Sequence, residues 1–363
     1  MKNKRVLIAT GGTGGHIYPG ITLADALIEH DNDVIFIGNE GNMEATLVPA
    51  SGYRFYAIKN KGLTGNAFLK IWRLLSQVKP TFISVKLLKK IKPDRVIVFG
   101  GYVSIPVGFA AWLCGIPLIL HEQNAIAGLA NRVLAPFASA IAVSYRDTMT
   151  QFPKKKTYFT GNPRGSLFVK KHEKKRFIDD LGLDHDMSTI LIVMGSLGSE
   201  TINHQLRFFI PLLKESNYQV IIATGVKHFD DFKKGIDQHV NCAIVDRIDQ
   251  LTALSYVDVI VCRAGATTVS EVIASLTPAI FVPSPYVVKN HQQKNIDPLL
   301  QAEAALLLSE DDFDATSLHQ MIRKLLSDPQ KIENIKNNLQ AFQTPQAIDD
   351  MMALIDKAGK DHG

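Results

Sequence analysis

The chain has 363 residues, which is more than one hydrophobic core usually supports, so we expect two domains. Apolar residues make up 46% and charged residues 21%, which is typical of a globular protein and excludes wholesale disorder. The three cysteines, Cys114, Cys242 and Cys262, lack C-x-x-C spacing, so they indicate neither a disulfide framework nor a structural zinc site and fit a reducing cytosol. The net charge is only +5, but residues 59–95 hold ten lysines and arginines and one acidic residue. Such a segment favours a phosphate-bearing partner: nucleic acid, an anionic membrane surface or a phosphorylated ligand.

Two apolar stretches resemble export or membrane signals but are predicted to be neither. The run at residues 6–9 is shorter than the roughly 7–15 apolar residues of a secretory signal, so we predict a first strand there. Residues 96–120 carry no charge, but glycines and prolines interrupt them repeatedly. This pattern predicts a strand, a turn, a short helix and a strand, all buried, and no membrane span.

The chain begins with a β-α-β pattern that recurs in its second half. A buried strand is expected at 5–10, a glycine-rich turn at 11–16 (GGTGGH), a helix at about 19–29 and a strand at 34–37. The same order recurs as a strand at 190–194, a turn at 195–199 (GSLGS), a helix to about 214 and a strand at 218–223. Further strands are predicted at 95–99, 117–121, 140–143, 243–245, 257–262 and 279–282.

Helical patterns separate these strands, which predicts an α/β protein with mostly parallel sheets. Two Rossmann-like domains in tandem explain the recurrence, and the length argues against the alternative of one large doubly wound sheet. The cluster of turn-forming residues at 161–165 (GNPRG) marks the expected boundary. A last helix is expected at about 346–357.

The first glycine-rich turn is a candidate ligand site. It is not the G-x-G-x-x-G dinucleotide fingerprint, because Ile17 stands where the third glycine would be, and it is not a P-loop. A helix that starts at this turn would favour an anion at its N-terminus. His16 lies at the carboxyl end of the first strand, where open α/β sheets bind ligands, so we predict a catalytic or binding role; the alternative is a surface histidine.

Several other segments carry polar residues at predicted strand ends. The turn at 195–199 and the segment 263–271 (RAGATTVSE) could each bind phosphate through backbone N–H groups, and Glu271 could accept from sugar hydroxyls or only balance a helix dipole. The side chains of 121–124 (HEQN) would be costly to bury without partners, so we predict that they line a cleft. Gln292 and Gln293 suit sugar hydroxyls, the alternative being plain exposure to solvent.

Two acidic triplets, at 31–33 (DND) and 184–186 (DHD), could hold a divalent cation, but both fall between a predicted helix and the next strand, so we interpret them as turn residues.

Residues 68–91 are basic and amphipathic, and Pro80 interrupts the pattern. Much of the apolar face must be core, but the excess of lysine predicts a membrane-surface element. Its candidate surface residues are Phe68, Lys70, Trp72, Arg73, Leu75 and Lys79. A non-enzymatic module that binds anionic lipid or nucleic acid would leave the glycine-rich turns unexplained.

Six strings occur in an order that resembles the MurG family of UDP-N-acetylglucosamine:N-acetylmuramyl-(pentapeptide) pyrophosphoryl-undecaprenol N-acetylglucosaminyltransferases, over about residues 5–350. They are GGTGGHIYPG (11–20), FGGYVS (99–104), HEQN (121–124), GNPR (161–164), GSLGS (195–199) and CRAGATTVSE (262–271). The resemblance implies a GT-B fold, in which two Rossmann-like domains face each other across a cleft. Residues 1–162 would form the acceptor- and membrane-facing domain, 163–342 the UDP-GlcNAc-binding domain, and 343–363 a last helix that could pack back on the N-terminal domain.

The resemblance also implies an activity. The enzyme would be an inverting, UDP-GlcNAc-dependent hexosyltransferase that moves GlcNAc to the 4-hydroxyl of MurNAc in lipid I and yields lipid II. Lipid II is used in peptidoglycan synthesis, so the enzyme would serve cell wall biogenesis, cell shape, cell division and the cell cycle. Its expected substrates are UDP-GlcNAc and undecaprenyl-linked lipid I. It would be peripheral to the anionic cytoplasmic face of the membrane, and other cell-wall synthesis proteins are possible partners. No cofactor, obligatory metal or nucleic acid is expected. A UDP-GlcNAc 2-epimerase and a transferase to another glycolipid stay open as alternatives.

By the same resemblance, His16 is the favoured general base and Glu122 the other candidate. A backbone contact at Ile248 would hold uracil, and Glu271 would hold ribose. The remaining expected substrate-binding positions are Thr13, Gly14, Gly15, Asn124, Arg164, Ser196, Arg263, Ala264, Gly265, Ala266, Thr267, Thr268, Gln292 and Gln293. Helix N-termini near Ser196 and Ala264, with Arg263 or Arg164, would stabilise the leaving diphosphate in place of a metal.

Overall fold

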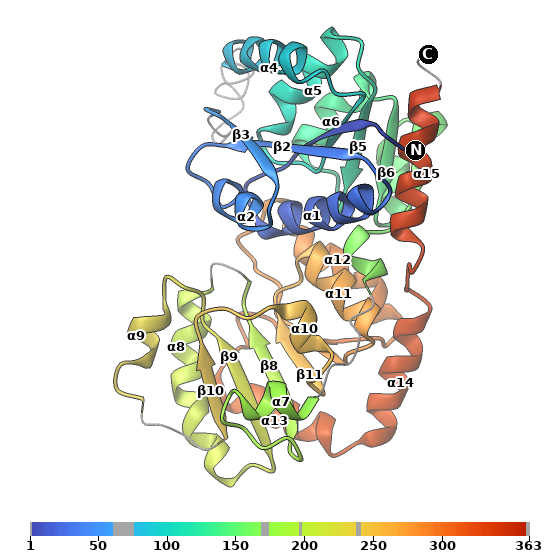
Figure 1. Cartoon of the computed structure of the whole chain (residues 1–363). Helices are drawn as coiled ribbons and strands as arrows, with labels where there is room; N and C mark the ends of the chain where they lie inside the picture. Colours follow the sequence, from blue (N-terminus) through green and yellow to red (C-terminus); the bar gives the residue numbers. More distant parts are fainter. Residues whose placement is uncertain (1, 61–75, 168–173, 196–197, 237–240, 361–363) are drawn as a thin grey trace. The chain divides into compact units, whose positions relative to one another are not determined.

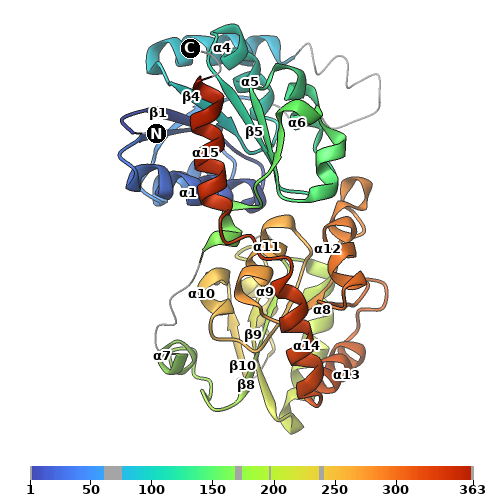
Figure 2. The same ribbon diagram turned by 90° about the vertical axis from the view of Figure 1, so that its right-hand side faces the viewer.

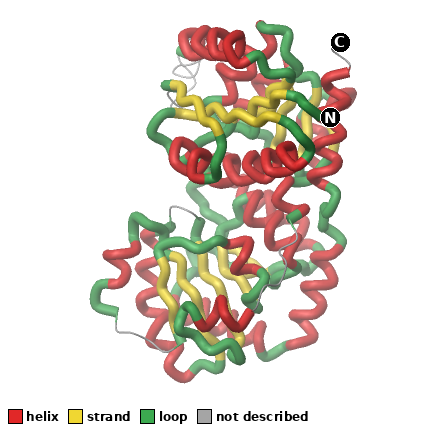
Figure 3. The backbone as a smooth tube through the Cα atoms, viewed as in Figure 1, coloured by secondary structure: helices red, strands yellow, loops and turns green. Residues whose placement is uncertain are grey.

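The computed structural model describes residues 2–60, 76–167, 174–195, 198–236 and 241–360. By its contacts the chain divides into two compact units. Unit 1 comprises residues 1–166 with 344–363, and unit 2 comprises residues 167–343. Each unit has its own parallel sheet with helices on both faces, so the alternative of a single large sheet is wrong (Figures 1 and 3).

Unit 1 contains a seven-stranded sheet in the order β3-β2-β1-β4-β5-β6-β7. Its strands are β1 (Arg5–Ala9), β2 (Asp33–Asn39), β3 (Arg54–Ile58), β4 (Arg95–Val98), β5 (Leu118–Glu122), β6 (Ala140–Val143) and β7 (Thr157–Phe159). Its helices are α1 (Gly14–Glu29), α2 (Glu44–Ala50), α4 (Val78–Ile91), α5 (Ser104–Leu113), α6 (Leu129–Leu134) and α15 (Ala347–Lys360), with 3-10 turns η1 (Ala135–Phe137), η2 (Arg146–Gln151), η3 (Lys154–Lys156) and η4 (Pro163–Ser166).

The central strand β1 shows why helices cover both faces of this sheet. Successive side chains of a strand point to opposite faces, so a buried strand is apolar throughout. Val6 and Ile8 join the core that contains residues of α1 and α15, whereas Leu7 and Ala9 join the core that contains residues of α4 and α5. Figure 2 shows α15, the last helix, lying along unit 1.

Unit 2 contains a six-stranded sheet in the order β10-β9-β8-β11-β12-β13. Its strands are β8 (Ser188–Val193), β9 (Tyr218–Ala223), β10 (Cys242–Val245), β11 (Val259–Cys262), β12 (Ala279–Phe281) and β13 (Leu306–Leu307). Its helices are α7 (Lys174–Asp179), α8 (Glu200–Phe209), α9 (Phe229–Lys233), α10 (Gln250–Leu254), α11 (Ala266–Ser275), α12 (His291–Gln301), α13 (Ala315–Leu326) and α14 (Pro329–Gln340), with 3-10 turns η5 (Ile210–Glu215) and η6 (Val288–Asn290).

The predicted start of the first helix is wrong, and Pro80, at which the amphipathic pattern is interrupted, lies inside a helix. The first helix begins at Gly14 and not near residue 19, because Pro19 is accommodated inside α1. In α4, Pro80 is the third residue of the helix, where its missing N–H has no partner to lose, so it lies in the first turn and does not interrupt the helix.

The acidic triplets lie between a helix and the next strand, as predicted, although one residue belongs to the strand. Asp31 lies in the turn after α1, whereas Asp33 is the first residue of β2 and is paired with Arg5 and Arg54. Residues 184–186 precede β8, where Asp184 accepts the backbone N–H of Asp186 at 2.9 Å. In the described ranges, no group of three His, Cys, Asp or Glu side chains is placed to hold a metal ion. None of the helices formed by those ranges has the length and apolar character that a membrane span requires.

Candidate active site

The first glycine-rich turn connects β1 to α1 at the carboxyl edge of the unit 1 sheet. The turn is shorter than predicted, because Gly14, Gly15 and His16 already form the first turn of α1. Thr13 is the N-cap residue in an extended conformation, and its side chain makes no capping bond. The backbone N–H of His16 donates to the carbonyl of Thr13 at 3.0 Å, so it closes the first turn of the helix, and the binding of an anion at this turn stays a prediction.

The ring of His16 is fixed by the turn from which it emerges. Its Nδ1 lies 3.1 Å from the carbonyl oxygen of Gly11, and Thr13 Oγ1 lies farther from it, at 3.5 Å. A carbonyl can only accept, so Nδ1 carries the proton and the lone pair of a neutral ring is on Nε2. Gly100, which follows β4, lies against the ring: a Cβ atom there would be 3.1 Å from Nε2. The turn and the segment that follows β4 therefore fix the orientation of the ring.

Glu122, the alternative base, is enclosed at the end of β5 and is only 1% exposed. Its Oε1 accepts from the backbone N–H and the side-chain amide of Asn124, at 3.0 and 3.2 Å. Its Oε2 accepts from Gly128 N and Asn131 Nδ2, both at 2.8 Å. Four donors satisfy this carboxylate, so its geometry is that of a residue that orders the loop and orients Asn124, and it argues against proton abstraction.

The prediction that 121–124 line a cleft is wrong for the first three residues. His121 and Gln123 are as buried as Glu122, at 0% and 1% exposure. His121 Nε2 donates to Gly161 O at 3.0 Å, and its Nδ1 accepts from Gln123 Nε2 at 3.0 Å. Burial lowers the pKa of His121 to about 4, although the bond to Gly161 opposes this shift, so the ring is neutral at pH 7. Local partners therefore offset the cost of burying His121 and Glu122, whereas Oε1 of Gln123 is buried without a hydrogen-bond partner among the described residues.

Arg164 joins the same edge of unit 1 from η4. Its guanidinium carbon lies 5.4 Å from the centre of the Tyr18 ring, which projects from α1 two residues after His16. Its backbone N–H donates to Asn162 Oδ1 at 3.0 Å. The structure thus brings a cation to the helix that carries His16.

In unit 2, the predicted phosphate-binding segment is the turn from β11 to α11. Gly265 is the N-cap of α11, so Ala266, Thr267 and Thr268 form the first helical turn. The carbonyl of Ala264 accepts from the fully buried Asn295 on α12, at 3.1 Å. This bond ties α12, with Gln292 and Gln293 in its first turn, to the phosphate-binding segment.

The residues expected to hold the nucleoside lie on α11 and in the connection that leads into α10. Glu271 on α11 is 4% exposed and accepts from Gln250 on α10 at 2.6 Å. Ile248 is half-buried in the connection that leads into α10. The two Gln side chains of α12 make local bonds: Gln292 accepts from Ser284 N at 2.8 Å, and Gln293 donates to Asp297 at 2.9 Å.

Arg263 lies in a buried network that the sequence did not predict. Its side chain is 11% exposed and donates to Glu310 Oε2 at 2.6 Å and to Val282 O at 3.1 Å. It also donates to Ser199 Oγ, the N-cap of α8, at 3.1 Å. Arg263 was predicted to stabilise a leaving diphosphate. In the structure its side chain, which follows β11, is bonded to residues in the connections that follow β8, β12 and β13.

Some predicted site residues fall outside the described ranges. These are Ser196 and the surface residues Phe68, Lys70, Trp72, Arg73 and Leu75. The remaining surface candidate, Lys79, is exposed on α4.

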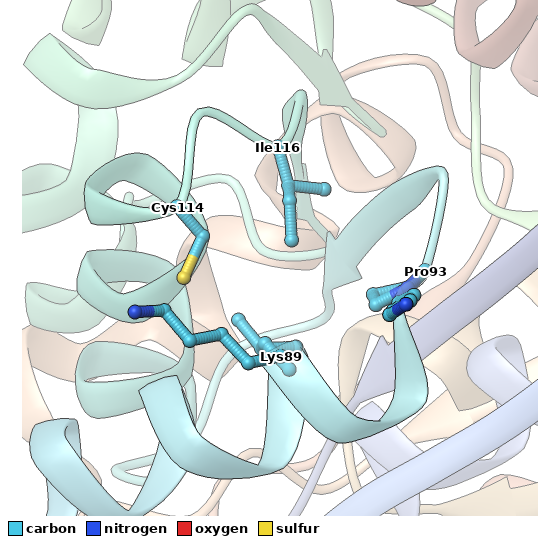
Figure 4. A pocket seen from close by; sticks show the side chains of 6 residues that line it. Lys89, Pro93, Cys114 and Ile116 are labelled. Atoms are coloured by element: carbon cyan, nitrogen blue, oxygen red, sulfur yellow. The ribbon is translucent and has the colours of Figure 1, made fainter.

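A hollow between α4 and the turn that precedes β5 lies away from these residues. Its lining includes Lys89, Pro93, Cys114 and Ile116 (Figure 4). Pro93 and Ile116 precede β4 and β5, so the hollow is at the amino edge of the sheet, whereas ligands of open α/β sheets bind at the carboxyl edge.

Family models match both halves of the chain. The glycosyltransferase family 28 N-terminal domain matches residues 6–143, and the glycosyltransferase family 28 C-terminal domain matches residues 189–351. Among solved structures, MurG of Acinetobacter baumannii aligns with a TM-score of 0.75 at 29% identity, over 98% of this chain and 99% of that one. A putative UDP-N-acetylglucosamine 2-epimerase of Listeria monocytogenes aligns with a TM-score of 0.70, but at 11% identity it shows the fold alone. The predicted GT-B fold is confirmed.

Curated relatives match over nearly their whole length. One from Limosilactobacillus fermentum is 36% identical over 99% of both chains, and one from Myxococcus xanthus is 33% identical over 96% of this chain and 91% of its own. Both are named UDP-N-acetylglucosamine–N-acetylmuramyl-(pentapeptide) pyrophosphoryl-undecaprenol N-acetylglucosamine transferase. With this identity and coverage, the predicted family is confirmed: the chain belongs to the MurG family of glycosyltransferases.

Proposed function

We propose that this enzyme transfers GlcNAc from UDP-GlcNAc to the 4-hydroxyl of MurNAc in undecaprenyl-pyrophosphoryl-MurNAc-pentapeptide, with inversion at the anomeric carbon. The observation that carries the proposal is the similarity, over nearly the full length, to relatives named for this transfer. The product would be the β-linked disaccharide lipid used in peptidoglycan synthesis.

In this reaction His16 is the general base. Its Nε2 takes the proton of the acceptor 4-hydroxyl while that oxygen forms a bond to the anomeric carbon of GlcNAc. The bond from this carbon to the β-phosphate oxygen breaks, and UDP leaves with the electron pair. The bond from His16 Nδ1 to Gly11 O supports this assignment, because it keeps the lone pair on Nε2. Glu122 serves instead to orient Asn124 toward the sugar.

The donor is held by unit 2. The first turn of α11 binds the diphosphate through Ala266, Thr267 and Thr268, Glu271 accepts from the ribose hydroxyls, and the backbone near Ile248 holds uracil. The partial positive charge at the N-terminus of α11 stabilises the negative charge that develops on UDP, so we propose that no metal is required. Arg263 contributes by holding the loops around this turn.

We also propose that the enzyme is peripheral to the cytoplasmic face of the membrane, through α4 and α5. Phe82 on α4 is 65% exposed and Trp112 on α5 is 51% exposed, and α4 presents Lys79 and other lysines to solvent. Exposed apolar side chains beside cations favour an anionic lipid surface.

The test is transfer from radiolabelled UDP-GlcNAc to a short-chain analogue of the acceptor lipid, with and without excess EDTA. We expect labelled lipid and stoichiometric UDP, with EDTA present or absent. UDP-GlcNAc alone should stay unchanged. Conversion of UDP-GlcNAc without acceptor would indicate a UDP-GlcNAc 2-epimerase. Transfer only to a different glycolipid would indicate a transferase with another acceptor. Loss of transfer in EDTA would contradict the proposal that no metal is required.

A further inference from the structure

A buried carboxylate lies behind the first glycine-rich turn, where the sequence indicated nothing. Glu44 is the first residue of α2 and is 0% exposed. Its Oε2 accepts the backbone N–H of Gly12 at 3.1 Å, and its Oε1 accepts the backbone N–H of Asn39 at 2.9 Å. A buried carboxylate is costly, so a position like this one calls for an explanation.

The bond to Gly12 connects Glu44 with His16 through a single peptide group. The N–H of Gly12 and the carbonyl of Gly11 belong to the same planar amide. Glu44 accepts from the N–H end, at 3.1 Å, and His16 Nδ1 donates to the carbonyl end, at 3.1 Å. A continuous chain therefore runs from carboxylate to amide to imidazole, and bonds in such a chain polarise one another.

Close packing leaves this chain no room to rearrange. A Cβ atom on Gly11 would lie 2.3 Å from Glu44 Oε1, so a side chain there would displace the carboxylate. On the other side, a Cβ atom on Gly101 would lie 2.4 Å from the carbonyl oxygen of Gly11. The amide is thus held between Glu44 and the backbone that follows β4.

We propose that Glu44 is a positioning residue for the general base, an inference that rests on the proposed function of His16. It holds the Gly11–Gly12 amide so that the carbonyl keeps the proton of His16 on Nδ1. Its negative charge, carried through the amide, stabilises the imidazolium that forms when Nε2 takes the acceptor proton. No proton moves to Glu44, and Nδ1 keeps its own proton throughout.

The place of His16 in α1 explains why such a counter-charge is needed. His16 lies in the first turn of α1, and the positive end of a helix disfavours a cation there. Other charged side chains on α1 and on the elements packed against it are Asp25 and Glu29 on α1, Asp33 on β2, which is paired with Arg5 and Arg54, Arg164 in η4, and Asp349, Asp350, Asp356 and Lys357 on α15. Asp25 is bonded to Tyr53, and Arg164 is a cation, so neither supplies the negative charge at the Gly11–Gly12 amide that Glu44 does.

The test compares Glu44→Gln with Glu40→Gln. Both variants replace a glutamate of the β2–α2 region with its neutral isostere, but Glu40 is exposed and paired with Lys59, so it is the matched control. For E44Q we expect kcat to fall about 10–100-fold, with the acid limb of the kcat–pH profile displaced. KM for UDP-GlcNAc should stay unchanged, because unit 2 holds the donor. E40Q should match the wild type in every measurement.

A second readout needs no turnover. In protein labelled with ¹⁵N-histidine, the His16 signals, assigned by their loss in His16→Gln, should show the proton on Nδ1 in the wild type. The apparent pKa of His16 should be lower in E44Q than in the wild type, by roughly half a unit to one unit. This measurement remains decisive in the wild type even where E44Q does not fold.

Three results would overturn the proposal: a wild-type His16 with its proton on Nε2, an E44Q variant with the wild-type His16 titration, or an E44Q variant that lowers kcat without moving the acid limb. The proposed function fails separately, when the wild type transfers no GlcNAc or when His16→Ala retains full turnover. The ¹⁵N measurements distinguish the two failures, because they depend on neither substrate.

Discussion

The two units contain glycine-rich turns of the same spacing, for which the proposed mechanism requires opposite charges. Gly11 and Gly14 follow β1, and Gly195 and Gly198 follow β8, each pair three residues apart. In unit 1 the helix begins at Gly14 itself, and in unit 2 it begins only at Glu200. Equal spacing therefore does not produce equal turns.

The buried side chains that contact the two turns carry opposite charges. Behind the turn of unit 1 is a buried carboxylate, Glu44, whose amide contact supports a base that must become positive. Beside the turn of unit 2 is a buried guanidinium, Arg263, whose contact with Ser199 fixes a loop near the proposed diphosphate. In the proposed mechanism, a common β-turn-α frame would thus accept a proton in one unit and face negative charge in the other, because of residues that come from elsewhere in the chain.

The largest expected effect is that of His16→Ala, which tests whether the base lies in unit 1 and the UDP site in unit 2. Turnover should fall by about 10²–10⁴-fold, because the general base is lost, while binding of UDP to unit 2 should be nearly unchanged. Calorimetric titration with UDP and steady-state transfer to the acceptor analogue measure the two effects. Full turnover in the variant would remove His16 from the mechanism, and a parallel loss of UDP affinity would show that the two sites are not separate in function.

The charge network of unit 2 can be broken at Glu310. Glu310→Gln leaves the guanidinium of Arg263 buried without its counter-ion, so the free energy of unfolding should fall by about 3 kcal/mol. Asp311→Asn, a neighbouring change at an exposed carboxylate, is the control and should have little effect. Urea unfolding followed by circular dichroism measures both. Equal stability of E310Q and D311N would show that the network does not hold the loops of unit 2.

Acid should act on unit 1 through His121. Burial lowers the folded-state pKa of this histidine to about 4, from a usual value near 6.5. Between these values the unfolded chain binds a proton that the folded chain does not, so stability is lost as the pH falls from about 6.5 through 4, by about 3 kcal/mol in total. His121→Gln cannot take up this proton, so its unfolding free energy should fall less between pH 7 and pH 4.

The control for this prediction is His204→Gln, which removes an exposed histidine of α8 and should leave the acid loss in place. Unfolding in urea at pH 7, 5.5 and 4 distinguishes the variants. If the pH dependence of H121Q runs parallel to that of the wild type, the acid sensitivity arises elsewhere.

Much of the fold was predictable because buried parallel strands are continuous apolar runs. The strands at 140–143 and 218–223 match β6 and β9 to the residue. The missed strands β3, β7 and β13 lie at sheet edges and are partly exposed, and apolar runs at 55–58 and 304–308 did not by themselves distinguish two of them from helix or loop.

The site was predictable at single residues and not in its contacts. His16 could be recognised because it follows a strand and a glycine-rich turn. Glu44 could not, because its bond to Gly12 spans 32 residues and depends on how α2 packs, and the same holds for the pair of Arg263 and Glu310, 47 residues apart. The donors that satisfy Glu122, the other candidate base, could not be predicted either, because Gly128 and Asn131 belong to the start of α6, whose packing against β5 the sequence does not reveal.

The smallest expected effect comes from alanine at two glycines, which distinguishes the effect of backbone strain from that of a displaced His16 ring. Gly101 and Gly115 both have positive φ, 79° and 67°, so alanine at either position should cost about 1–2 kcal/mol of stability from backbone strain alone, and more at Gly101, where the added Cβ atom also meets backbone. A Cβ atom at Gly115 would meet nothing within 4 Å, whereas one at Gly101 would lie 2.4 Å from the carbonyl that holds His16. Gly101→Ala should therefore lower kcat, by about tenfold, and Gly115→Ala should not. Thermal unfolding and steady-state transfer measure the two quantities on the same samples. Equal kcat values of the two variants would mean that the carbonyl of Gly11 can move without misplacing the base. The Gly11–Gly12 amide, which distinguishes the turn of unit 1 from that of unit 2, would then have no role in catalysis.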